Sequence, residues 1–373
     1  MARWRLITGV AGVATGVIAA GAGVVLAAEK IAVGRQRMRP DPEAGEPLGE
    51  LRGQPLTVLA ADGAALHAEI DGPDDAPVTV IFCHGYALNQ DIWHYQRRDL
   101  ADLGRLVFWD QRGHGRSGRT GHSSGGGAGA SPRPVSIGQL GEDLYAVLRA
   151  TSPGPAPVVL VGHSMGGMTI MALAADHPEL FGTKVIGTVL ISTAATAVDP
   201  AGWLPAPVRL AARQAAVPVL RGVARGRPAA LVERLRSSAG DLAFISTRHI
   251  AFSDREISPA VVDFLEHMIR STRIGVVADF FQALLAHDKQ EALAIVGRVP
   301  SAVIVGDRDR LIGSLGENLA RGIPGARLIL LPETGHVPML ERHAAVTEAI
   351  AALVAEARRA GPGQPAPRHG ARG

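Results

Sequence analysis

A serine among glycines, in LVGHSMGGM (residues 160–168), is the first place in this sequence where chemistry could occur. Ser164 follows the apolar run PVVLVG and precedes the helical pattern MGGMTIMALAAD. A G-x-S-x-G sequence at a strand-to-helix turn is typical of a nucleophile elbow, in which a strained backbone holds the serine hydroxyl at the tip of the turn. Gly162 and Gly166 would relieve the crowding on either side. By itself the pattern also fits an ordinary tight turn, because glycine and serine are common in turns.

A nucleophilic serine needs a base, and the base needs a carboxylate to orient it. The stretch VIVGDRDRLIG offers Asp307 and Asp309, and LILLPETGHVPMLE places His336 after a glycine. The order serine, aspartate, histidine is the one expected for a G-x-S-x-G hydrolase. All three groups follow predicted strands, and open α/β sheets build their sites at the carboxyl ends of strands. We therefore predict a Ser-His-Asp triad.

The negative charge that develops on an ester oxygen needs two hydrogen-bond donors. The stretch VIFCHGYALNQDIW ends a predicted strand at His84-Gly85, where the chain can turn away from the sheet. The amide of Tyr86 can then point back toward the serine. Together with the amide of Met165, at the start of the following helix, it would form an oxyanion hole.

A second charged turn, WDQRGHGRSG, follows the next predicted strand. We interpret it as structural, with Asp110 and Arg112 fixing the loop by hydrogen bonds and His114 at the surface. The remaining residues of this turn motif are Gly113, Gly115 and Ser117.

The elements that must position these residues are visible as alternating patterns from about residue 55. Residues 56–62 and 65–71 bracket Gly63 and predict a hairpin. Apolar runs such as VTVIFC and LVFWD alternate with helical stretches, which indicates a mostly parallel sheet with helices on both faces. The predicted helices lie near residues 91–103, 138–150, 166–177, 314–322 and 342–359.

The strand-and-helix rhythm divides the chain into a core and an insertion. We predict an α/β core in residues 55–195 and 297–357. Residues 196–296 contain apolar residues at helical spacing and predict a helical cap over one edge of the sheet. Five of the eight phenylalanines lie there, as Phe244, Phe252, Phe264, Phe280 and Phe281. They could line an apolar acyl pocket, but for most of them we favour packing of the cap on the sheet.

Composition excludes several classes of protein. The 373 residues are 47% hydrophobic and 20% charged, as in globular proteins. The net charge of +3 is concentrated at the two ends, which leaves a mildly acidic body without the basic surface that a nucleic-acid partner requires. The single cysteine, Cys83, excludes an internal disulfide and predicts a buried strand thiol. The 13 histidines show no paired metal-ligand spacing, so we expect neither a metal nor a cofactor.

The N-terminal region is a separate unit. Residues 6–28 contain no charge and would reach roughly 34 Å as a helix, enough to cross a bilayer core of about 30 Å. We predict that residues 1–40 form a single-helix membrane anchor, with a cleaved secretion signal as the alternative. Basic residues flank both ends, so the orientation is not predicted. Residues 41–54 are expected to be a solvated linker, and residues 358–373 a disordered basic tail.

The elbow GHSMGG, the His84-Gly85 turn, the charged turn and Gly335-His336 together resemble the α/β-hydrolase family, over residues 55–357. In that family the acid lies in a G-x-x-D turn, which here is Gly306 to Asp309, so the resemblance implies Asp309 rather than Asp307. Met165 after the serine is most similar to esterases, lipases and cofactor-free haloperoxidases. Ser164 argues against the dehalogenases and epoxide hydrolases, which have an aspartate at the elbow.

The expected function is hydrolysis of a carboxylic ester, hydrophobic or lipid-like, through an acyl-enzyme. Two alternatives remain open at this stage. One is another reaction at the same site, such as perhydrolysis or cleavage of a C–C or amide bond. The other is a non-catalytic, membrane-anchored interaction protein that retains the fold. The sequence does not indicate an oligomeric state.

Overall fold

The computed structural model describes residues 41–119, 135–198, 247–254 and 256–361. Within these residues, eight strands form one sheet in the order β1-β2-β4-β3-β5-β6-β7-β8. The strands are β1 (Gln54–Leu59), β2 (Ala65–Asp71), β3 (Thr79–Cys83), β4 (Arg105–Trp109), β5 (Val158–His163), β6 (Val185–Ile191), β7 (Ser301–Gly306) and β8 (Arg327–Leu331).

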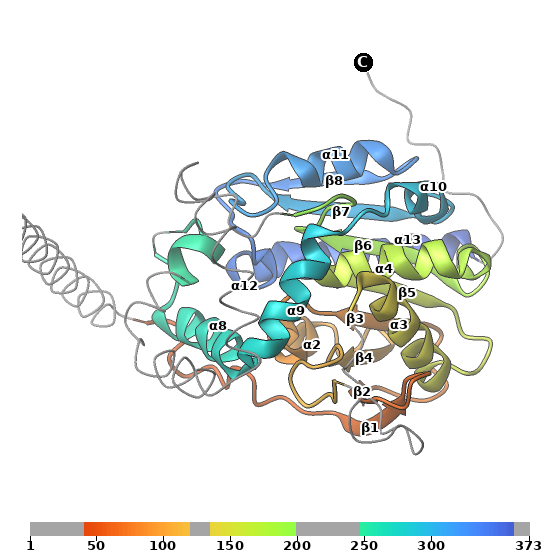
Figure 1. Ribbon diagram of the computed structural model, residues 1–373, viewed down its shortest axis with the longest axis horizontal. Coiled ribbons are helices and arrows are strands. Elements are labelled where there is room, and N and C mark those ends of the chain that lie inside the picture. Colours follow the sequence, from red (N-terminus) through yellow and green to blue (C-terminus); the bar gives the residue numbers. More distant parts are fainter. Residues whose placement is uncertain (1–40, 120–134, 199–246, 255, 362–373) are drawn as a thin grey trace, which may run out of the picture.

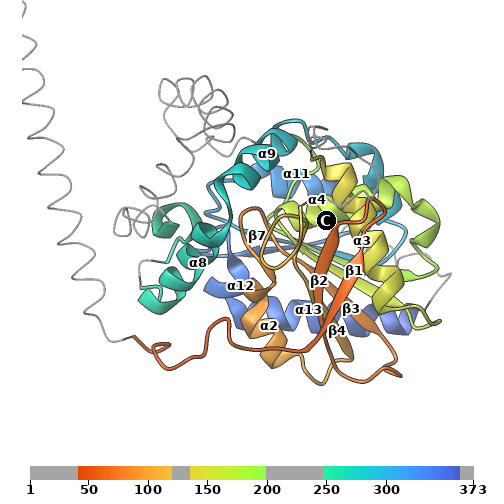
Figure 2. The same ribbon diagram turned by 60° about the horizontal axis from the view of Figure 1, so that its bottom comes forward.

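The sheet is parallel except at one edge. β1 and β2 form the predicted hairpin around Gly63, and β2 also runs antiparallel to β4. From β4 through β8 every neighbouring pair is parallel. Figure 2 shows the hairpin at its edge of the sheet. The predicted mostly parallel sheet is confirmed.

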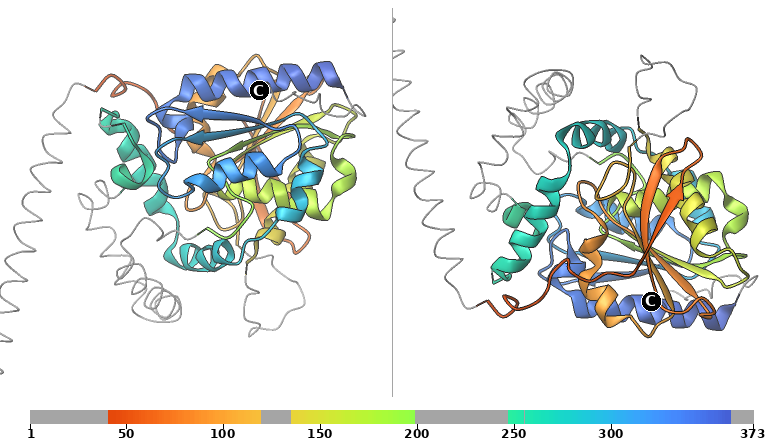
Figure 3. Two further views of the ribbon diagram at one scale, coloured as in Figure 1. Left: turned by 90° about the horizontal axis from the view of Figure 1, so that it is seen from above. Right: turned by 90° about the horizontal axis from the view of Figure 1, so that it is seen from below.

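Helices cover both faces of the sheet, as predicted (Figures 1 and 3). One face packs against α3, α4, α10 and α11, and the other against α2 and α13. The helical elements of the described residues are η1 (Gln90–Trp93), α2 (His94–Asp99), α3 (Ile137–Thr151), α4 (Met165–Asp176), η2 (Pro178–Leu180), α8 (Pro259–Ser271), α9 (Ile274–Leu285), η3 (Gln290–Ala292), α10 (Leu293–Val296), α11 (Ser314–Gly322), α12 (Pro338–Glu341) and α13 (His343–Ala360). The helix predicted over residues 91–103 is shorter, because it starts as a 3₁₀ turn and ends at Asp99.

The central strands are apolar throughout because both of their sides are buried. Every residue of β3, β5, β6 and β7 lies in the interior. Cys83 is among them and accepts a hydrogen bond from the Trp109 indole nitrogen at 3.4 Å. Burial raises the pKa of its thiol to about 12. The prediction of a buried strand thiol is confirmed.

Two cap helices, α8 and α9, lie at the edge where the parallel strands end (Figure 1). Phe252 and Phe280 are buried in this region, in keeping with a packing role, whereas Phe264 and Phe281 are only partly buried. Phe244 lies outside the described residues. The chain returns from the cap through η3 and α10 to β7.

The segment predicted as a solvated linker makes specific contacts with the core and the cap. Glu46 pairs with His94 of α2 at 2.7 Å, and the Tyr95 hydroxyl donates to Glu43. Asp41 accepts hydrogen bonds from the Ser258 hydroxyl and from the amide of Ala260, at the start of α8. The first described residue therefore lies beside a cap helix.

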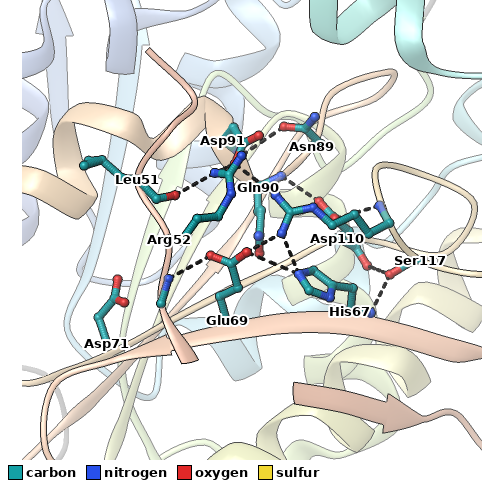
Figure 4. A network of polar contacts seen from close by, with 12 residues as sticks. Leu51, Arg52, His67, Glu69, Asp71, Asn89, Gln90, Asp91, Asp110 and Ser117 are labelled. Carbon is teal, nitrogen blue, oxygen red and sulfur yellow. Dashed lines mark hydrogen bonds and ion pairs between the residues drawn. The ribbon is translucent and has the colours of Figure 1, made fainter. Parts of the chain in front are cut away.

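A polar network then joins this segment to the sheet edge (Figure 4). Glu69 of β2 is buried; its carboxylate accepts a hydrogen bond from the Gly53 amide at 3.0 Å and pairs with Arg97 and Arg116. Burial alone would raise the pKa of Glu69, but these three donors outweigh it and lower the pKa to about 2. The carboxylate is therefore ionised at neutral pH, and it binds Gly53, the residue before β1, to β2.

Some predictions concern residues that the structure does not describe. The apolar stretch 6–28 and residues 362–373 of the predicted tail lie outside the described residues. Residues 358–360, also predicted to belong to the disordered tail, are instead the helical end of α13. Among the helices that are described, none combines the length and apolar character needed to span a bilayer.

Candidate active site

Ser164 stands between β5 and α4 with φ 50° and ψ −117°, in the left-handed region that residues other than glycine rarely adopt. The turn is tight because of its neighbours. A Cβ at Gly162 would lie 2.7 Å from the carbonyl carbon of Gly166, and one at Gly166 would lie 2.1 Å from the Cys83 oxygen. The glycines thus permit a strained, partly exposed serine at a helix N-terminus, where the helix dipole favours negative charge.

His336 and Asp309 form a buried pair. His336 Nδ1 lies 2.9 Å from Asp309 Oδ2, and the aspartate side chain is fully enclosed. Its other oxygen, Oδ1, accepts hydrogen bonds from the amides of Leu311 and Ile312 at 2.9 and 3.0 Å. Burial by itself opposes ionisation, but His336 and these amides lower the pKa of Asp309 below its usual value. Nδ1 of His336 therefore donates to an ionised carboxylate.

The other candidate acid, Asp307, does not contact the histidine. Its Oδ1 accepts a hydrogen bond from the amide of Thr334 at 3.2 Å, which joins the loop after β7 to the loop after β8. The structure thus pairs His336 with the aspartate that the family resemblance implied.

His163, the residue before the serine, connects the elbow to the histidine loop. Its Nε2 donates to the main-chain oxygen of His336 at 2.9 Å, and the two rings are 5.0 Å apart between centroids. Burial lowers the pKa of His163 to about 3, so the ring stays neutral. Ser164 and His336, which are distant in the sequence, are in this way brought to the same end of the sheet.

The candidate oxyanion loop follows β3. Its Tyr86 hydroxyl donates to the Val277 oxygen of α9 at 2.6 Å, and Thr272 donates to the Ala87 oxygen at 3.1 Å. Ala87 has a positive φ of 59°, so the chain reverses sharply after Gly85 and Tyr86. Met165 supplies the first amide of α4, at the helix N-terminus. The contacts of Tyr86 and Ala87 thus bind the candidate oxyanion loop to the cap.

His114 holds the same loop from inside, and the prediction that it lies at the surface is wrong. The ring is fully buried, 5.0 Å from the Phe280 ring of the cap. Nδ1 donates to the Arg112 oxygen at 3.1 Å, and Nε2 accepts the Ala87 amide at 3.2 Å. Burial lowers the pKa of His114 to about 3, which keeps Nε2 available as an acceptor. The cap insertion covers this turn, and a pattern local to the turn does not show that.

His84 has a comparable structural role. Nδ1 donates to the Gly85 oxygen at 2.8 Å, and Nε2 accepts the Gln111 amide at 2.9 Å. The Gln111 side chain continues the network, donating to the His84 oxygen and accepting from Thr169 of α4. The sequence interpretation did not identify Gln111 or Thr169, because nothing in their local pattern shows that they meet.

The charged turn is fixed as predicted. Asp110 accepts hydrogen bonds from the amides of Gln90 and Arg116, each at 2.8 Å. Arg112 forms a two-pronged ion pair with the buried Asp143 of α3. Among the described residues, no group of three histidine, cysteine or acidic side chains is placed to hold a metal ion.

Fold and site define the class of protein. The family model described as the alpha/beta hydrolase family matches residues 80–349, and the chain belongs to this family of hydrolases. It is 27% identical to 3-oxoadipate enol-lactonase 2 of Acinetobacter baylyi over 79% of this chain and 95% of that protein. It is 25% identical to the AB hydrolase superfamily protein YisY of Bacillus subtilis, over 73% of this chain and 90% of that protein.

Solved structures show the same fold. An esterase from Thermogutta terrifontis superposes with a TM-score of 0.62 at 22% identity, covering 82% of this chain and all of that one. The enol-lactonase from Burkholderia xenovorans superposes with the same TM-score at 24% identity, covering 80% of this chain and all of that one. The predicted fold and family are confirmed.

Proposed function

We propose that this hydrolase cleaves carboxylic esters through an acyl-enzyme formed on Ser164. The observation that carries the proposal is the buried His336–Asp309 pair, whose histidine ring lies 5.0 Å from that of His163, the residue before a serine in a strained turn at a helix N-terminus. A serine alone is a weak nucleophile at neutral pH, and an adjacent oriented base is what activates it.

Each step then has a residue to perform it. His336 Nε2 takes the proton of the Ser164 hydroxyl as the serine oxygen attacks the ester carbonyl, and the amides of Tyr86 and Met165 donate to the oxyanion. The proton passes from His336 to the leaving alcohol as the C–O bond breaks. Water then attacks the acyl-enzyme with His336 as the base, releasing the carboxylic acid and the free serine. Asp309 orients the imidazole and stabilises its charged form.

The similar proteins support an ester rather than another acyl compound. One similar structure is described as an esterase and another as an enol-lactonase, and a relative in sequence is a 3-oxoadipate enol-lactonase; these names denote cleavage of an acyl–oxygen bond. Perhydrolysis is a second candidate, because a bifunctional esterase/perhydrolase of Acinetobacter calcoaceticus is 33% identical over 36% of this chain.

A fluorophosphonate probe tests the proposal directly. We expect the folded protein to be labelled at Ser164, since the probe reacts with activated serines and mimics the tetrahedral intermediate. Labelling is followed by mass spectrometry of the modified peptide. A folded protein that resists the probe would contradict the hydrolase mechanism and favour a non-catalytic interaction protein.

We further propose that the ester is hydrophobic. The cap helix α9, which binds the Tyr86 hydroxyl, is predominantly apolar, and the apolar stretch 6–28 suits a lipid environment. We expect kcat/KM for p-nitrophenyl esters to rise from acetate to a medium-length chain. Rates that fall steadily beyond acetate would contradict a lipid-like substrate.

We also propose that residues 6–28 anchor the protein in a membrane. Asp41 is bound to the start of α8, so such an anchor would join the folded domain next to the cap. The full chain is expected in the membrane fraction and a chain starting at residue 41 in the supernatant, with equal activity on a short soluble ester. If expression of the full chain instead gives a protein in the supernatant that has lost its N-terminus, residues 6–28 belong to a cleaved secretion signal.

A further inference from the structure

Glu341 is the last residue of α12, follows the candidate catalytic His336 shortly in the sequence, and is buried. Its carboxylate accepts three main-chain hydrogen bonds. Oε2 accepts the amide of Gly335 at 2.6 Å, and Oε1 accepts the amides of Ser253 and Asp254 at 2.8 and 2.5 Å. One oxygen thus binds the loop of His336, and the other binds the chain that enters the cap.

The histidine loop and this cap segment, residues 251–254, are in direct contact. The His336 amide donates to the Ala251 oxygen at 2.8 Å. A Cβ at position 335 would lie 2.4 Å from that same oxygen and 2.9 Å from the Ser253 nitrogen, so only glycine allows this approach. Glu341 therefore bridges two backbone segments that pack without an intervening side chain.

Only a carboxylate satisfies this arrangement fully. Burial raises the pKa of Glu341, and the amides of Gly335, Asp254 and Ser253 oppose that rise, as does Arg342. Three N–H donors converge on two acceptor oxygens, whereas a glutamine would present one acceptor oxygen and one amide NH₂ group, which can only donate. A nearby acid, Glu333, lacks this role: it is exposed and pairs with Arg308 at 2.9 Å.

We propose that Glu341 is a positioning residue, which sets His336 for proton transfer by tying its loop to the cap segment 251–254. This inference rests on the proposed function, because it assigns the effect of Glu341 to the base of that mechanism. His336 must keep Nδ1 on Asp309 while presenting Nε2 to Ser164. A misplacement of about 1 Å at such a group can cost about 100-fold in rate.

The test is Glu341→Gln in the full chain, assayed on an ester that the wild-type protein cleaves. We expect kcat to fall about 10- to 100-fold, with KM changing less than about threefold, because substrate contacts are retained. In a His336→Ala background, Glu341→Gln should change the residual rate less than about twofold, since the residue acts through the missing base. Glu333→Gln is the matched control and should keep wild-type kcat.

A second pair of variants covers the case in which Glu341→Gln does not fold. Asp254→Pro and Asp254→Ala both remove the carboxylate that binds Arg342, but only proline removes the amide given to Glu341. We expect the proline variant to have a kcat about tenfold below that of the alanine variant.

The possible failures are distinguishable. A wild-type protein that neither labels nor cleaves esters would overturn the proposed function and this inference with it. An active wild type with folded Glu341→Gln at full kcat would overturn only the inference. Equal kcat losses in the presence and absence of His336 would do the same, because they would show that Glu341 does not act through the histidine. If Glu341→Gln does not fold, equal kcat in the two Asp254 variants would overturn it.

Discussion

Replacing Ser164 with alanine is expected to lower kcat for ester hydrolysis by roughly 10⁵- to 10⁶-fold and to abolish fluorophosphonate labelling. The hydroxyl oxygen is the atom that would bond to the acyl carbon, so its removal leaves only the electrostatic stabilisation of the site. Ester turnover in the steady state and mass spectrometry of the probe adduct measure the two effects.

Ser192→Ala is the matched control for this variant. Ser192 follows β6 and has a positive φ of 45°, so alanine meets the same backbone requirement there. Its buried hydroxyl has no hydrogen-bond partner among the described residues. We expect kcat within a few-fold of wild type. If Ser164→Ala retained activity while remaining folded, the acyl-enzyme mechanism would be wrong.

Changing Asp309 to asparagine is expected to lower kcat by about 10⁴-fold while leaving the fold intact. The amides of Leu311 and Ile312 would bind the asparagine oxygen, which turns the NH₂ group toward His336. Nδ1 would then have to accept a hydrogen bond, and the ring proton would move to Nε2. A histidine protonated at Nε2 cannot take the proton from Ser164.

Asp307→Asn, in the same turn, is the control for this prediction. Its oxygen accepts the Thr334 amide, and an asparagine oxygen can do the same. We expect wild-type kcat for it, and circular dichroism should show both variants folded. Comparable losses in the two variants would mean that the turn, rather than the acid, determines the rate.

Local patterns predicted the elements and the elbow well, because both depend on short-range physics. A central parallel strand is apolar along its whole length since both of its sides are buried, and this is visible in runs such as PVVLVG. The requirement for glycine at position 162 arises within the turn, from Gly166, whereas that at position 166 comes from the Cys83 oxygen of β3. The order of the three candidate catalytic residues is likewise a property of the chain alone.

What only the tertiary structure decided is which polar groups meet. The contact of His336 with Asp309 spans 27 residues, that of His336 with His163 spans 173, and that of Glu341 with Ser253 spans 88. Burial of a polar side chain depends on what packs over it, and the cap helix α9 covers His114. The sequence by itself determined the sheet, the elbow and the candidate nucleophile, because strand burial and turn strain are local. The partners of the acid, the oxyanion loop and Glu341 depended on folding, because hydrogen bonds between distant segments exist only once those segments are packed together.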